Sequence, residues 1–123
     1  MALPNSGDEI LLLHNPKCSK SRQTLALLEE RGVEFTTRLY LEDPLAAEEL
    51  SELGKRLGKA PRDFTRTKQV EFAEAGLTSE SGDGEVLKAM AATPILMERP
   101  VVVRGERAAI GRPPEAVLEL LDD

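Results

Sequence analysis

The chain has 123 residues, which is the usual size of one domain. Its 16 basic and 22 acidic residues give a net charge of −6, which disfavours nonspecific binding to nucleic acid. The single cysteine excludes an internal disulfide and any metal site built from several cysteines.

The start of the chain carries no sign of export or of a membrane anchor. Residues 1–9 are polar and lack a basic segment, and the apolar run at 10–13 is too short for a signal peptide or a membrane span. We therefore expect a cytoplasmic monomer with a flexible tail over residues 1–9 and neither membrane nor nucleic-acid partners. We also expect no metal and no tightly bound cofactor.

The first half of the chain alternates strand and helix patterns. The continuous apolar run at 10–13 predicts a buried strand. Residues 19–31 are rich in helix formers and are followed by Gly32, which predicts a helix that stops there. Residues 33–41 alternate β-branched and aromatic side chains and predict a second strand. A strand, a helix and a strand in this order predict a parallel pair joined by a right-handed crossover.

A helical segment follows the turn at Asp43 and Pro44. Its apolar residues recur at helical spacing, and it has few residues that favour strands. We expect a helical insertion over about 45–93, beside the sheet and with a loop at 79–84. Its expected helices cover residues 46–57, 69–75 and 85–92.

The strand pattern returns near the end of the chain. Residues 101–104 and 107–110 predict a hairpin with Gly105 at the first turn position. Pro113 and Pro114 then open a last helix. The order βαβ, helices, ββα predicts an α/β fold of the thioredoxin-like type, with a mixed sheet and a helical insertion. We expect residues 10–123 to form this single domain.

Cys18 stands between the first strand and the first helix. There its thiol would face free backbone N–H groups and the positive end of the helix dipole, which both favour the thiolate. Lys17, Lys20 and Arg22 surround it without any acidic residue, and an imidazolium at His14 would add to the effect. Cys18 is thus a candidate nucleophile, whereas the plainer alternative is a small buried side chain.

The residues after the cysteine read as Cys-x-x-Cys with serine in the second position. Such a site can form one bond to sulfur or to an oxyanion but cannot resolve it internally. The hydroxyl of Ser21 could donate a hydrogen bond to the thiolate. Alternatively, Ser19 or Ser21 caps the helix, and the two roles are compatible.

Basic residues gather in three segments of this acidic chain, at 14–22, 59–69 and 99–112. If the fold brings these segments together, they form an anion site. Arginine suits a tetrahedral oxyanion because its planar fork binds two oxygens at once. Arg99 and Arg112 each precede a proline at the end of an element, where functional side chains tend to lie, whereas Arg104 and Lys59 are interpreted as solvated surface charges.

These features together resemble the glutaredoxin-coupled arsenate reductase family. The loop HNPKCSKSR at 14–22 is similar to that family's His-Asn-Pro-x-Cys-x-x-Ser-Arg active-site loop. The stretch LYLEDP at 39–44 resembles a motif after its second strand. Three further segments resemble those that carry its three arginines: 61–77, 94–103 and 110–113, with Arg66, Arg99 and Arg112. The resemblance runs from about residue 10 to residue 121.

The resemblance implies a mechanism and a set of roles. Cys18 would attack arsenate as a thiolate, glutathione would serve as the reducing co-substrate, and glutaredoxin would resolve the mixed disulfide and release arsenite. The oxyanion would be held by Arg66, Arg99 and Arg112, while His14 and Ser21 would keep the cysteine ionised. Asn15 and Arg22 would complete the substrate-binding loop. In this family the proline after the second arginine, here Pro100, is cis.

Two departures leave alternatives open. Ser19 and Lys20 stand where established members carry small uncharged residues, and the chain ends soon after its last helix. One alternative is a glutathione-dependent thiol oxidoreductase without arsenate activity. Another is a redox-sensing, non-catalytic regulator that binds RNA polymerase, which Ser21 and the three arginines disfavour. Spacing alone does not choose between Arg62 and Arg66, and the resemblance chooses Arg66.

Overall fold

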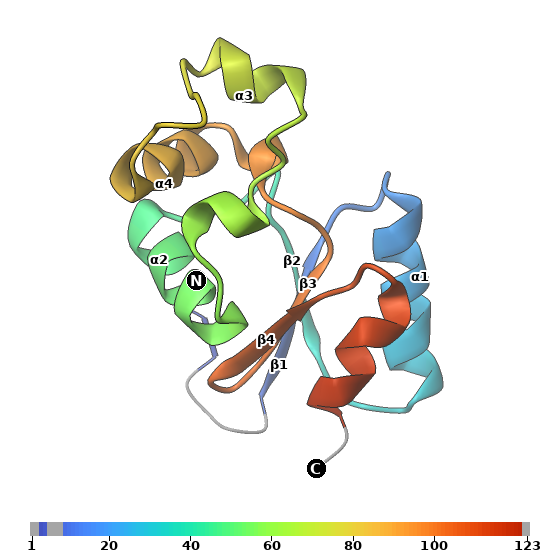
Figure 1. Cartoon of the computed structure of the whole chain (residues 1–123). Helices are drawn as coiled ribbons and strands as arrows, with labels where there is room; N and C mark the ends of the chain where they lie inside the picture. The colour runs from blue at the N-terminus through green and yellow to red at the C-terminus, as the bar shows by residue number, and fades with distance from the viewer. Residues whose placement is uncertain (1–2, 5–8, 122–123) are drawn as a thin grey trace. The chain divides into compact units, whose positions relative to one another are not determined.

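The protein is described by a computed structural model that covers residues 3–4 and 9–121 (Figure 1). It consists of two compact units, which we describe separately. Unit 1 comprises Met1–Asp43 and Arg99–Asp123, and unit 2 comprises Pro44–Glu98. Most of the expected flexible tail lies outside the described residues, and the expected insertion at 45–93 falls inside unit 2.

Unit 1 is built on a four-stranded mixed sheet. Its strands are β1 (Ile10–His14), β2 (Thr36–Leu39), β3 (Val101–Arg104) and β4 (Arg107–Ile110), in the order β2-β1-β3-β4. β1 pairs in parallel with β2 and antiparallel with β3, which pairs antiparallel with β4. The predicted parallel pair and hairpin are confirmed, and Gly105 takes a φ of +57° at the first turn position.

One face of this sheet is covered by two helical segments of unit 1. They are α1 (Ser19–Glu30) and the 3₁₀ helix η3 (Pro114–Leu120), which contact each other and lie side by side in Figure 1. The buried cluster between them and the sheet consists of Ile10, Leu12, Leu28, Val102, Val117 and Leu120. Since side chains alternate along a strand, Leu11 and Leu13 point to the opposite face, where they are also buried. This packing anchors β1 and α1, which flank Cys18.

Several elements of unit 1 differ in detail from the predictions. β2 is shorter than the predicted 33–41, because the N–H groups of Glu42 and Asp43 both donate to the carbonyl of Leu39 and turn the chain. The last helix is a 3₁₀ helix, as short helical pieces often are. Arg104 and Arg107 both donate to the carbonyl of Leu120 at its end, so Arg104 has a structural role.

Unit 2 contains the remaining helices. They are α2 (Ala47–Leu57), η1 (Pro61–Phe64), α3 (Val70–Glu74), α4 (Asp83–Ala92) and η2 (Pro94–Leu96). α2 packs against α4, and an isolated bridge joins Thr65 to Met97. α4 begins two residues before the predicted start, with Asp83 and Glu85 in its first turn, where acidic side chains complement the helix dipole. The two short 3₁₀ helices were not predicted, since three or four residues carry no recognisable period.

The α/β fold class is confirmed. Among the residues that the structure describes, no helix is long and apolar enough to cross a membrane. Within the same ranges, His, Cys, Asp and Glu side chains form no group of three that could hold a metal ion.

Candidate active site

Cys18 is the N-cap residue of α1 and lies directly after the turn that leaves β1. Its N–H donates to the carbonyl of Asn15 over 3.0 Å, and its own carbonyl accepts the N–H of Arg22 over 3.0 Å. These two bonds fix the backbone on both sides of the thiol.

The prediction that Ser19 or Ser21 caps the helix is wrong, because the cap residue is Cys18 and no side chain makes a capping hydrogen bond there.

Cys18 is largely buried, with 9% of the residue exposed. Burial alone raises the pKa of this thiol. Hydrogen bonds from the N–H of Ser21, the side chain of Arg99 and the N–H of Lys20 act in the opposite direction, as does the charge of Arg99. Together they lower the pKa of Cys18 below its usual value. The helix N-terminus and one arginine therefore favour the thiolate, as the position of Cys18 in the sequence suggested.

Two arginines from distant parts of the chain meet at this sulfur. The Nη2 atom of Arg112 lies 3.8 Å from the Sγ atom of Cys18, and its Nε atom donates to the carbonyl of Arg99 over 2.7 Å. Arg99 in turn contacts the sulfur through its own side chain. The Nε and Nη1 atoms of Arg99 are buried and have no hydrogen-bond partner among the described residues. Buried donors without partners are rare, and here they lie beside a nucleophile, where an oxyanion would satisfy them.

Both arginines precede a cis proline. The bonds Arg99-Pro100 and Arg112-Pro113 are both cis. The first was expected from the resemblance, whereas nothing in the sequence led us to expect the second. The fact that the two arginines converge on one sulfur agrees with the expected anion site.

Sequence reasoning missed Gly111, which lets the segment that carries Arg112 approach α1. Its N–H donates to the carbonyl of Pro100 over 2.8 Å. A Cβ atom built on Gly111 would lie 2.6 Å from the Oγ1 atom of Thr24 and 2.8 Å from Pro100. Thr24 is fully buried in α1 and donates to the carbonyl of Lys20 over 2.9 Å, so it cannot easily yield. The only signal in the sequence was a glycine directly before Arg112 and Pro113.

We expect Gly111→Ala to displace Arg112 from Cys18. Overpacking at this contact should cost about 1–3 kcal/mol of stability. Misplacing the arginine should lower kcat/KM for the oxyanion substrate by about tenfold or more. Gly84→Ala is the matched control, because Gly84 lies within α4 with no atom near its Cβ position. If both variants keep wild-type kinetics, the close contact at Gly111 does not position Arg112.

His14 and Ser21 form a pair behind the nucleophile. The Oγ atom of Ser21 accepts the N–H of Asn15 over 3.0 Å and lies 2.5 Å from the Nδ1 atom of His14. Ser21 thus supports Cys18 through its backbone N–H, while its hydroxyl is engaged by His14. Burial, and then the positive charge of Arg22, lower the pKa of His14. Both effects disfavour an imidazolium beside the thiolate, and the expected role of His14 in keeping Cys18 ionised stays a prediction.

The protonation of His14 can be measured directly, because it is the only histidine. We expect nitrogen NMR to report a neutral ring at pH 7, and the tautomer shows whether Nδ1 accepts from the Ser21 hydroxyl or donates to it. Its titration midpoint should lie below that of a histidine in a peptide. Arg22→Gln should raise the midpoint, because the charge of Arg22 is one of the two effects that lower it. A wild-type ring protonated at pH 7 would contradict the effects of burial and of Arg22 described above.

The other predicted site residues have local partners. The Oδ1 atom of Asn15 accepts the N–H of Lys17 over 3.1 Å, and the Nη1 atom of Arg22 donates to the carbonyl of Pro16 over 2.8 Å. Both contacts hold the shape of the 14–22 loop. Their expected contact with substrate stays a prediction.

The choice between Arg62 and Arg66 concerns unit 2. The guanidinium of Arg62 donates to the carbonyls of Thr78 and Ser81, so it ties two segments of unit 2 together. The N–H of Arg66 donates to the carbonyl of Leu96 over 2.6 Å. This leaves Arg66 as the candidate from the resemblance, and its role toward Cys18 stays a prediction.

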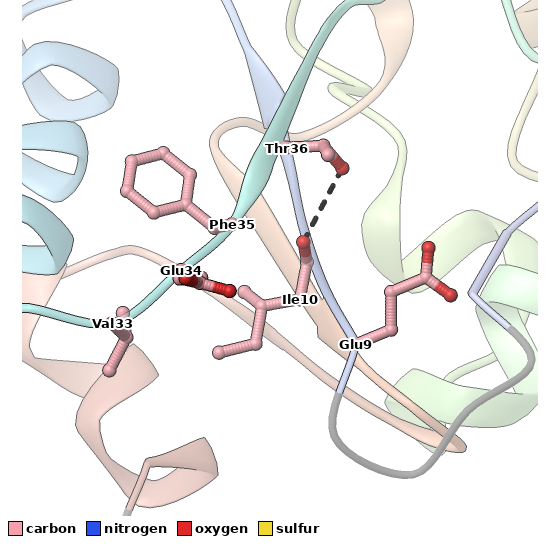
Figure 2. A pocket seen from close by; sticks show the side chains of 6 residues that line it. All are labelled: Glu9, Ile10, Val33, Glu34, Phe35 and Thr36. Carbon is pink, nitrogen blue, oxygen red and sulfur yellow. Dashed lines mark hydrogen bonds between the residues drawn. The ribbon is translucent and has the colours of Figure 1, made fainter.

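A pocket of about 590 Å³ lies elsewhere in unit 1, at the start of β1 and β2. Figure 2 shows its lining side chains, which are Glu9, Ile10, Val33, Glu34, Phe35 and Thr36. It contains no cysteine, histidine or basic side chain. Since Cys18 follows the other end of β1, this pocket has no part in the chemistry of the thiol.

Comparisons with known proteins agree with this geometry. Residues 13–120 match the ArsC family. The chain is 42% identical to the arsenate reductase of Haemophilus influenzae, over 91% of this chain and 98% of that protein. It is 48% identical to the uncharacterised protein YfgD of Escherichia coli, over 92% and 97% of the two chains. The solved structure of the arsenate reductase from Vibrio cholerae superposes with a TM-score of 0.88 and 44% identity, over 94% and 99% of the two chains.

Proposed function

The chain belongs to the ArsC family, and from this premise we propose that it is an arsenate reductase whose nucleophile is Cys18. One observation on this chain's own structure supports the proposal, in addition to the similarity to its relatives. The thiolate of Cys18 lies beside Arg99, whose Nε and Nη1 donors are buried and without partners among the described residues. A tetrahedral oxyanion placed against the sulfur would accept both hydrogen bonds, so one arginine would bind substrate and stabilise the thiolate.

The first chemical step forms a bond between sulfur and arsenic. The thiolate attacks arsenate, a bond from arsenic to oxygen breaks, and the oxygen leaves as water after protonation. The charge on the remaining oxygens is held by Arg99 and Arg112, which lie close enough to follow the sulfur through the reaction. Arg66 is proposed to supply a third guanidinium. The hydrogen bonds and the charge that lower the pKa of Cys18 make the thiolate easier to form, so they take over part of the work of a base.

The second step needs a thiol from outside the chain, because there is no other cysteine. We propose glutathione for this role. Its sulfur bonds to the Sγ atom of Cys18 while the bond to arsenic breaks, and the electron pair of that bond stays on arsenic. Arsenic is thereby reduced from As(V) to As(III) and leaves as arsenite, and Cys18 is left in a mixed disulfide. Glutaredoxin is proposed to resolve this disulfide by thiol exchange.

A coupled assay tests the proposal. The protein is mixed with arsenate, glutathione, glutaredoxin, glutathione reductase and NADPH, and the loss of NADPH is followed. We expect a loss that requires every component and that disappears when arsenate is replaced by phosphate, which has no accessible two-electron reduction. The absence of an arsenate-dependent signal, with the coupling enzymes shown to be active, would overturn the proposal.

The same assay separates the proposal from its nearest alternative. For this comparison glutaredoxin is left out, and the NADPH loss caused by glutathione alone is subtracted. A thiol oxidoreductase without arsenate activity would then speed up NADPH loss with a small disulfide such as hydroxyethyl disulfide, but the complete assay would show no loss with arsenate. A non-catalytic regulator would add to NADPH loss with neither.

A further inference from the structure

Two exposed lysines stand on either side of the nucleophile without an evident task in binding the oxyanion. Lys17 directly precedes Cys18, and Lys20 is the second residue of α1. Among the described residues neither lysine has a carboxylate partner, and the segment from residue 14 to 22 contains no acidic side chain. Arg22, the third cation of this segment, is already held by the carbonyl of Pro16.

The backbone places both lysines at the rim of the thiol site. The N–H of Lys20 is one of the donors to the Cys18 sulfur, so its side chain starts beside that atom. Helical side chains lean toward the N-terminus of their helix, which here is the end where Cys18 lies. The N–H of Lys17 is held by the Oδ1 atom of Asn15, which fixes the other side of the rim.

The site holds more positive charge than one oxyanion uses. Arg99 and Arg112 contact the sulfur and each other, and Arg99 presents two buried donors that suit a tetrahedral anion. The two lysines are exposed, flexible and strongly hydrated, which suits brief contact with a carboxylate in water rather than a fixed grip. Their charge therefore suits a second anion that binds transiently at the entrance of the site.

We propose that Lys17 and Lys20 bind the carboxylates of the thiol co-substrate and thereby select anionic thiols over neutral ones. This rests on the proposed function, in which glutathione is the second reactant. Glutathione has two carboxylates and one ammonium, so it carries net negative charge at pH 7. The lysines would attract it toward Cys18 and orient its sulfur toward the sulfur of Cys18.

Thiol–disulfide exchange at Cys18 tests this selection without any arsenate. The thiolate attacks one sulfur of oxidised glutathione, the disulfide bond breaks, and one glutathione leaves as a thiolate while Cys18 keeps the other half. The rate is measured by mass spectrometry and divided by the rate with hydroxyethyl disulfide, which is uncharged. Changes in the reactivity or pKa of Cys18 affect both rates and cancel largely in this ratio.

The decisive variant is Lys17→Gln with Lys20→Gln. Coulomb attraction across a few ångströms of water predicts that its ratio falls roughly threefold to tenfold at low ionic strength. The difference should nearly vanish in 1 M salt. The matched control is Lys68→Gln with Lys88→Gln, which changes the net charge equally at two exposed lysines of unit 2.

The outcomes separate this proposal from the function on which it rests. A ratio that is unchanged in the Lys17/Lys20 variant, or that falls equally in the control, overturns carboxylate binding even if arsenate is reduced normally. A fall confined to the Lys17/Lys20 variant supports it even if the coupled assay with arsenate fails, because oxidised glutathione alone reports the selection.

Discussion

Cys18→Ser is expected to abolish arsenate-dependent turnover, by a factor of about 10⁴ or more, as removal of a nucleophile typically does. Serine has the same shape, but its hydroxyl stays protonated at neutral pH and cannot form a redox-active bond to arsenic or to glutathione. The fold should hardly change, because the backbone bonds on both sides of residue 18 do not use the side chain.

The measurement is the NADPH-coupled rate, together with the thermal unfolding midpoint. Ser19→Ala is the control, since Ser19 is the exposed neighbour of Cys18 and makes no capping hydrogen bond. It should keep most of the activity. If Cys18→Ser kept more than a few per cent of the rate while folded, the chemistry would lie elsewhere in the chain.

Arg99→Lys is expected to lower kcat/KM for arsenate by about 10²-fold, the usual cost of losing a preorganised donor to a developing oxyanion. Lysine keeps the positive charge but lacks the planar fork that carries the two unpartnered donors of Arg99. The same change should raise the pKa of Cys18, because the hydrogen bond from Arg99 is one of the effects that lower it.

Two readouts are needed for this variant: steady-state kinetics with arsenate, and the pH profile of Cys18 alkylation with free glutathione as an internal standard. In the wild type the profile should have its midpoint below that of glutathione, and in Arg99→Lys it should move upward. Arg107→Lys is the control, since Arg107 contacts the carbonyl of Leu120 at the end of η3. Equal losses in the two variants would mean that Arg99 acts through the fold and not through the oxyanion.

Most of the sheet in unit 1 could be predicted, because its strands carry strong local signals. The apolar run before Asn15 predicted β1, and a glycine between two short β-rich runs predicted the hairpin around Gly105. The predictions were wrong where the structure does not depend on the local sequence pattern. The extent of β2 depends on the double turn at Leu39, and the form of the last helix depends on how a seven-residue segment satisfies its hydrogen bonds.

The nucleophile could also be predicted, whereas the partners of its neighbours could not. Cys18 could be recognised from the sequence, because it directly precedes a predicted helix and has basic residues around it. The pKa of His14 depends on burial and on Arg22, and its ring contacts the hydroxyl of Ser21; these features are visible only in three dimensions. Gly111 was missed for the same reason, because its importance comes from Thr24, which lies 87 positions earlier in the chain.

The most direct test of the central claim is to identify the arsenic species after the reaction. Arsenate is incubated with the protein, glutathione, glutaredoxin and the NADPH system, and arsenate and arsenite are separated and quantified over time. We predict that arsenite appears in step with NADPH loss for the wild type and does not appear above background for Cys18→Ser. Arsenic that remains as arsenate with the wild type, while glutaredoxin and glutathione reductase are shown to be working, would contradict the assignment of this chain as an arsenate reductase.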